Sequence, residues 1–89
     1  MVERFELVGV STADVLRMAD ELGLVVREMG VLRGTGARHW HLTKAGERGV
    51  LEVSELAEVV WLEVRSNRRG DWIGGVIAAL THTPQPPSP

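Results

Sequence analysis

The sequence predicts an α+β fold, a two-layer sandwich in which two helices cover one face of a mostly antiparallel sheet of four to five strands. Three observations support this class: short segments alternate apolar and polar residues, two longer segments repeat apolar residues at helical spacing, and the later strands have short connections. Consecutive strands with short loops pair antiparallel, so the element order is β-α-β-β-β-β-α. One domain is expected over residues 1–80, followed by a disordered, proline-rich tail over 81–89.

The first two elements are a strand and a capped helix. Residues 2–10 alternate as a strand does. Ser11 then begins a helix, because its hydroxyl can accept from a free amide of the first turn and Asp14 follows at the spacing of a capping box. Apolar residues recur at helical spacing over 15–22, and Gly23 follows where a left-handed residue ends a helix.

The middle of the chain predicts a hairpin. Residues 24–33 form its first strand, with a bulge at Gly30. The turn is Gly34-Thr35-Gly36, because a tight turn needs residues that accept positive φ. Residues 37–43 alternate cleanly and form the second strand. A polar, glycine-rich loop follows over 44–49.

The last part of the chain predicts two more strands and a second helix. The strands cover residues 50–54 and 59–65, and the segment 55–58 between them is a turn or a short helical piece. Asp71 is expected to cap a helix over 72–80, whose apolar residues recur at helical spacing.

The composition narrows the class of function. The chain has 89 residues, a formal net charge of −2 and no cysteine. These values exclude disulfides and thiolate chemistry, and they do not favour nucleic acid as a partner. The sequence lacks a signal peptide and any apolar run near the roughly 20 residues that span a bilayer, so a cytoplasmic protein without membrane contact is expected. No cofactor is expected. Nine arginines against one lysine are typical of a thermophilic bacterium, or equally of a GC-rich genome.

Loop symmetry predicts how the central strands pair. If the loop after residue 43 closes symmetrically, His41 lies opposite Glu52. If the next connection centres near residues 56 and 57, Glu52 in turn lies opposite Trp61. This register buries Trp40 beneath the helices. The helix-free face then gathers six side chains: His39, His41, Glu52, Trp61, Glu63 and Arg65.

Two histidines on this helix-free face raise the question of a metal. His39 and His41 lie two residues apart on one strand face, and Glu52 could supply a third ligand. Because histidines at this spacing also occur by chance, no metal is predicted, and a metal-binding module is kept as an alternative. The simpler interpretation is a His41–Glu52 pair, in which ionised Glu52 would raise the pKa of His41.

Two short patterns resemble enzymes that cleave phosphoesters. His41-Leu42-Thr43 resembles the H-x-T signature of the two-histidine phosphoesterases, which need two such motifs where this chain has one. The element order over residues 11–54, with Gly36 ahead of His39, is similar in outline to the RNA-cutting HicA-type toxin domain; the extra strands and the acidic balance depart from it. These resemblances imply an RNA- or phosphoester-cleaving alternative that uses His39 and His41 with Arg38.

An anion site is a further candidate. A glycine turn can bind an anion through backbone amides, and a cluster of arginines can attract one. The candidate residues are Gly34, Gly36, Arg65, Arg68 and Arg69.

The leading hypothesis is a non-catalytic binding or assembly module that acts as a homodimer. A small domain stabilises itself only modestly, and a sheet face without helices invites a twofold partner. The candidate interface residues are Trp61, Val59 and Glu63. Whether this small protein is an enzyme is left open, with the non-enzymatic interpretation favoured because no complete catalytic set is present.

Overall fold

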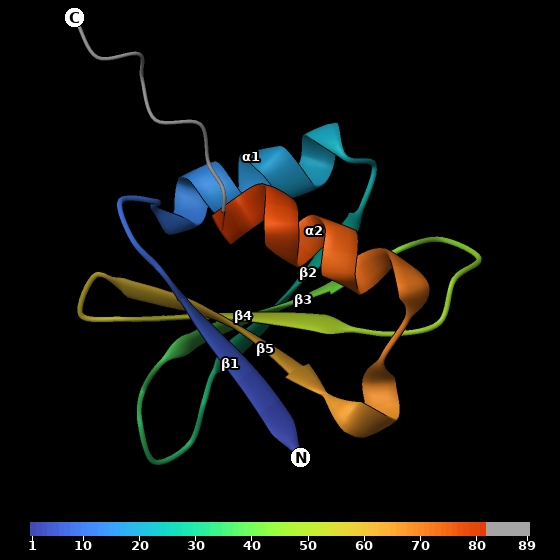
Figure 1. The fold of residues 1–89 in the computed structure, drawn as a ribbon. Helices are drawn as coiled ribbons and strands as arrows, with labels where there is room; N and C mark the ends of the chain where they lie inside the picture. The colour runs from blue at the N-terminus through green and yellow to red at the C-terminus, as the bar shows by residue number, and fades with distance from the viewer. Residues whose placement is uncertain (82–89) are drawn as a thin grey trace, which may run out of the picture.

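The computed structural model describes residues 1–81 and confirms the α+β sandwich (Figure 1). The elements are β1 (Val2–Leu7), α1 (Thr12–Glu21), β2 (Val25–Val31), β3 (Arg38–Thr43), β4 (Leu51–Leu56), β5 (Val59–Arg65), the 3₁₀ helix η1 (Ser66–Arg68) and α2 (Asp71–Thr81). The strands form one antiparallel sheet in the order β1-β5-β4-β3-β2, and both helices lie on one face of it (Figure 1). The predicted tail lies outside the described residues, except for Thr81, which ends α2.

The start of α1 agrees with the prediction, and the start of α2 corrects it. The Ser11 hydroxyl accepts from the Asp14 amide at 3.1 Å, and the Asp14 carboxylate accepts from the Ser11 amide at 3.2 Å, which completes the capping box. Asp71 was expected to cap the second helix from outside, but it is the first residue of α2. The backbone carbonyl of Gly70 accepts from the Ile73 amide at 3.1 Å and so begins that helix. Of residues 1–81, no helix is long and apolar enough to cross a membrane.

The β2–β3 hairpin forms as predicted. Gly34 and Gly36 have φ values of 89° and 77°, which residues with a β-carbon resist. The backbone amide of Leu32 donates to the Ala37 carbonyl at 2.8 Å and closes the loop. The register shifts by one residue between Glu28 and Gly30, which confirms the bulge.

Pairing of the central strands is confirmed on one side and corrected on the other. His41 lies opposite Glu52, as loop symmetry required. On the other side Glu52 lies opposite Glu63 and not Trp61. The expected turn or short helix at 55–58 is a tight turn of Ala57 and Glu58, with φ values of 49° and 67°, so β4 continues to Leu56. The register therefore differs from the predicted one by two residues, which leaves every side chain on its predicted face.

The hydrophobic core lies between the sheet and the two helices. Trp40 is 2% exposed, and the leucines and valines beside it on β3, β4 and β5 are equally buried: Leu42, Leu51, Val53, Val60 and Leu62. Trp72 of α2 also packs against this cluster, and its indole donates to the backbone carbonyl of Arg48 at 2.7 Å. The core therefore occupies one face of the sheet and leaves the other to polar chemistry.

Candidate metal centre

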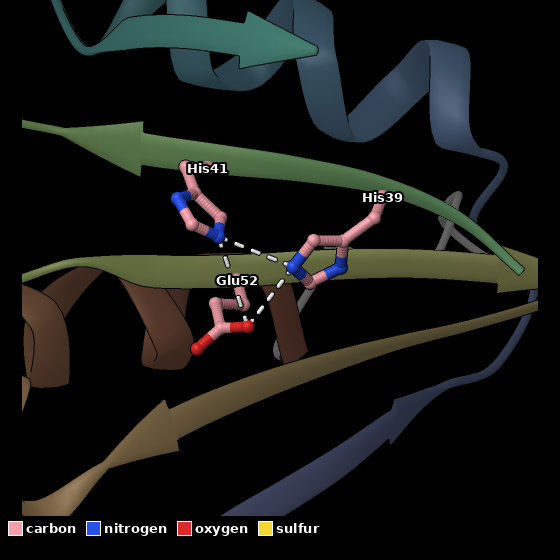
Figure 2. A group of neighbouring side chains, drawn as sticks. All are labelled: His39, His41 and Glu52. Atoms are coloured by element: carbon pink, nitrogen blue, oxygen red, sulfur yellow. Dashed lines mark hydrogen bonds and ion pairs between the residues drawn. The ribbon is translucent and has the colours of Figure 1, made fainter. Parts of the chain in front are cut away.

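Three side chains from neighbouring strands meet on the helix-free face of the sheet. His39 and His41 come from β3 and Glu52 from β4, and Figure 2 shows all three directed toward one point. The two histidines share a face because side chains alternate along a strand. Glu52 joins them because it pairs directly with His41. The short loop between β3 and β4 therefore assembles the cluster.

The three converging atoms are the two histidine Nε2 atoms and one carboxylate oxygen. Nε2 of His39 lies 2.9 Å from Oε1 of Glu52 and 3.2 Å from Nε2 of His41. Nε2 of His41 lies 3.8 Å from the same carboxylate oxygen. Each of these atoms carries a lone pair when its group is deprotonated at that position. Three lone pairs aimed at one point favour a shared cation there.

A second layer of contacts orients two of these ligands. Nδ1 of His39 lies 2.8 Å from the buried hydroxyl of Ser54. When Nδ1–H donates to that hydroxyl, Nε2 is left unprotonated and directed into the cluster, which is how a metal-bound histidine is usually held. On the carboxylate, Nε of Arg65 donates to Oε2 at 2.8 Å. Oε1 is thereby left for the histidines.

Burial makes this arrangement energetically demanding. Glu52 is 3% exposed and His39 is 6% exposed. A buried carboxylate needs charged or hydrogen-bonded partners, because it has lost its hydration. Arg65 supplies a charged hydrogen-bond donor, and that hydrogen bond to Glu52 in turn raises the pKa of the Arg65 guanidinium. Every buried polar side-chain atom of residues 1–81 has a partner.

Glu52 acts on the His41 pKa in the predicted direction, but the net shift of that pKa is downward and not upward as expected. Burial lowers the pKa of the His41 imidazole, and the attraction of Glu52 only partly offsets that. Nearby His39, Arg68 and Arg27 lower it further. The physical reason is that the partly buried ring has lost hydration, which disfavours its charged form by more than Glu52 favours it. His41 is therefore held in its neutral form, the form that binds a metal.

The separations between the three atoms suit a tetrahedral ion. Zinc binds histidine nitrogen and carboxylate oxygen at about 2.0–2.1 Å, which places tetrahedral ligand atoms about 3.3 Å apart. The three observed separations of 2.9, 3.2 and 3.8 Å bracket that value. A circle through the three atoms has a radius of about 2 Å, so an ion bonded to all three lies just outside their plane. The fourth tetrahedral position is then open.

A hollow of about 650 Å³ lies over the cluster. His39, His41 and Glu52 line it, together with residues from β2, from β1 and from the end of β5. An ion held by these three residues would therefore be reachable from solvent, as is typical of zinc sites that bind a ligand and not of sites that only stabilise a fold.

Arg38 does not join the histidines. It lies on the opposite face of β3, where its guanidinium stacks 4.8 Å from the ring centre of Trp40. It pairs there with Glu28 at 3.4 Å and with Glu55 at 3.7 Å. The catalytic set suggested from the sequence, which needs Arg38 beside both histidines, is therefore not assembled in one place.

The anion candidates separate into three groups. Arg65 and Arg68 line the hollow over the histidine cluster. Arg69 instead pairs with Glu3. Gly34 and Gly36 lie in the β2–β3 loop and do not line the hollow.

The residues predicted to form a dimer interface expose little apolar surface around Trp61. Trp61 is 7% exposed within a single chain. The Arg4 guanidinium stacks 4.3 Å from its ring centre, and its indole donates to Glu63 at 2.5 Å. Val59, at the start of β5, is 43% exposed. The face around Trp61 is thus largely covered by the chain's own side chains.

Two contributions to the site were missed at the level of sequence. Ser54 lies opposite His39, a pairing that the predicted β3–β4 register already implied. Arg65 was placed on the correct face but assigned only to an anion cluster, because the predicted β4–β5 register set it too far from Glu52. The two-residue correction makes Arg65 a diagonal neighbour of Glu52, close enough for a hydrogen bond.

No family model, curated protein or solved structure matches this chain. The geometry of the cluster therefore carries the functional inference by itself.

Proposed function

We propose that this protein binds a zinc ion through His39, His41 and Glu52, with the fourth coordination position open to the hollow. The observation that carries the proposal is the convergence of three ligand atoms, all within 4.8 Å of one another. A proton shared between His39 and Glu52 accounts for one short contact, but a single proton does not account for three atoms gathered around one point. A divalent ion accounts for all three.

The ligand set favours zinc over magnesium and calcium. Two imidazoles and one carboxylate suit zinc, whereas magnesium and calcium prefer all-oxygen sites. The contact of His39 with Ser54 and that of Glu52 with Arg65 orient the ligands in advance. In this proposal the chain is a binding module, and the metal is the group through which it binds.

Zinc titration of the purified protein tests the proposal. We expect one zinc per chain, measured by calorimetry or by competition with a coloured chelator, and weak binding of magnesium. His41→Gln and Glu52→Gln each lower zinc affinity by more than about 100-fold, since loss of an orienting partner alone costs about 10–100-fold. Cobalt bound at the same site gives the strong visible absorption of a tetrahedral complex.

Glu58→Gln is the matched control. It removes the same charge from the hairpin that carries Glu52, but Glu58 is exposed in the β4–β5 turn. Zinc affinity unchanged in this variant and lost in the two ligand variants supports the proposal. Zinc that fails to bind the wild-type chain, or that binds equally to all three variants, sinks it and leaves the cluster as a buried polar network.

We also propose that the chain forms a homodimer, and that β2 is its contact strand. All seven residues of β2 are exposed, and four of them are large and apolar: Val25, Val26, Met29 and Val31. β2 is an edge of the sheet, so its outer backbone groups are free to pair with another strand. A second copy placed antiparallel along β2 continues the sheet and covers the three valines, while Met29 lines the hollow.

Sedimentation at micromolar concentration tests the dimer. We expect twice the 9.8 kDa chain mass for the wild type and a monomer for Val31→Lys, which places a charge on the exposed edge. Trp61→Glu is the comparison for the interface expected around Trp61. Dissociation by that variant and not by Val31→Lys would move the interface to β5, and a wild-type monomer would remove the dimer.

A further inference from the structure

The hollow over the candidate zinc site has two chemically different walls. One wall comes from the end of β5 and from η1, and it is basic and polar: Arg65, Asn67 and Arg68. The other comes from β2 and the segment that follows it, and it is apolar: Met29 and Leu32. The rest of the lining is His39, His41 and Glu52, together with Met1, Val2 and Ser66 at the ends of β1 and β5. A ligand that fills this space therefore meets a cationic side and an apolar side.

The charge in the hollow is unbalanced toward the positive. Glu52 is the carboxylate that lines it, and the zinc ion would use one of its oxygens. Arg65 donates through Nε to the other oxygen, which leaves the terminal nitrogens of its guanidinium unused. Arg68 has no acidic partner among residues 1–81. Two guanidinium groups and an open metal position thus face one space, where an anion is the complementary ligand.

The number of donors indicates which anion fits. A carboxylate has two oxygens, whereas a phosphate group has three that can bind separate partners. The open metal position and the groups of Arg65 and Arg68 make three positive partners. A phosphate group is also much smaller than a space of about 650 Å³, which falls in the range of small-molecule sites. The remaining space, beside Met29, suits an apolar substituent.

We infer that the hollow binds a phosphate monoester, with one phosphate oxygen on the metal, the others held by Arg65 and Arg68, and the organic group against Met29 and Leu32. This inference rests on the proposed zinc site, because the metal supplies one of the three phosphate contacts. It names the class of ligand for that site and does not require any bond to break.

Calorimetric titration of the zinc-loaded full chain tests the inference, with phenyl phosphate, inorganic phosphate and benzoate as three probes at physiological salt. We expect phenyl phosphate to bind at least ten times more tightly than inorganic phosphate, and benzoate to bind weakest. Arg68→Gln should weaken phenyl phosphate at least tenfold and leave zinc affinity within about twofold. Met29→Ser should weaken phenyl phosphate and leave inorganic phosphate unchanged.

Arg33→Gln is the matched control. Arg33 is an exposed arginine of the β2–β3 loop that does not line the hollow, so its loss changes the net charge alone. Equal weakening by Arg33→Gln and Arg68→Gln, or benzoate binding as tightly as phenyl phosphate, would overturn the inference. So would equal binding of the two phosphates, because the apolar wall would then have no role.

The zinc titration of the wild type separates the two proposals. Zinc bound without phenyl phosphate binding overturns the inference and leaves the proposed metal site standing. Zinc that does not bind overturns the proposed function and this inference with it.

Discussion

The two faces of the sheet are both buried near their centres, yet they are buried in different ways. On the helix-covered face, Leu42, Leu51 and Leu62 are fully buried among other apolar side chains. On the helix-free face, His39 and Glu52 are almost as inaccessible, but they contact polar groups. The same strands build both faces by alternation of their side chains.

The difference shows that burial alone does not define a core. Apolar burial stabilises the covered face in proportion to the area removed from water. Burial of Glu52 costs hydration, and the charged hydrogen bond from Arg65 compensates for part of it. A costly polar cluster beneath an open hollow is typical of a site, whereas the covered face follows from packing alone.

Substitution of the two buried tryptophans should give the largest effect and tests this comparison directly. Trp40 lies in the covered core, whereas Trp61 lies on the other face beneath the Arg4 side chain. We expect Trp40→Ala to lower the free energy of unfolding by about 3–5 kcal/mol, because it leaves a cavity in the core. Trp61→Ala should cost less, since the side chains over it can move into the space. Urea unfolding of both variants measures this, and an equal or larger loss for Trp61→Ala would contradict the distinction between the faces.

The next largest effect is expected at Ser54, on the affinity of the proposed zinc site. Ser54→Ala removes the partner of His39 Nδ1, so the ring loses the contact that orients it. We expect zinc affinity to fall about 10–100-fold, as it does when an orienting partner of a metal ligand is lost. Ser66→Ala is the control, because Ser66 lines the same hollow without contacting a ligand. Competition with a chelator measures both variants, and equal affinities would show that Ser54 has no part in the site.

A substitution in the β4–β5 turn should change the stability of the fold without affecting either face of the sheet. Glu58 has a φ of 67°, a conformation that residues with a β-carbon adopt at a cost of about 1–2 kcal/mol. Glu58→Gly removes that strain but adds flexibility to the unfolded chain, so we expect a net gain of about 0.5–1 kcal/mol. Thermal unfolding should show a higher midpoint and zinc titration an unchanged affinity. A lower midpoint would mean that Glu58 makes a contact that outweighs the strain.

The pH dependence of the metal-free protein should be the smallest effect. Burial lowers the pKa of His41 in the folded chain below its usual 6.5, so the unfolded chain binds a proton first as pH falls. The stability from neutral His41 is therefore present above pH 6.5 and is lost as pH falls through the folded pKa. Because the ring is partly exposed, we expect the loss to be under about 1 kcal/mol.

Urea unfolding at pH 7.5 and 5.5 measures this loss against His41→Gln, which should lack that part of the pH dependence. An identical pH profile in the variant would assign the dependence to other groups. For the same reason zinc affinity should rise with pH, because protons compete with the metal for the histidines.

Local patterns in the sequence were enough to predict the helices and strands, and to place His39, His41 and Glu52 together on one face. The capping residues Ser11 and Asp14 and the glycines of the β2–β3 turn act within a few residues of themselves. Alternation along β3 placed His39 and His41 on one face, and the symmetric loop after them set Glu52 opposite His41. Each of these features depends on short-range geometry, so the sequence alone was sufficient.

The tertiary structure decided what depends on distant parts of the chain. Ala57 and Glu58 are not residues that mark a tight turn, so the β4–β5 register could not be predicted from them. That register brings Arg65 to Glu52. The downward shift of the His41 pKa likewise depends on burial and on Arg68, which is distant from His41 in the sequence. The sequence therefore shows which side chains are candidate metal ligands. Their charge balance and their access to solvent arise only when separate strands are brought together.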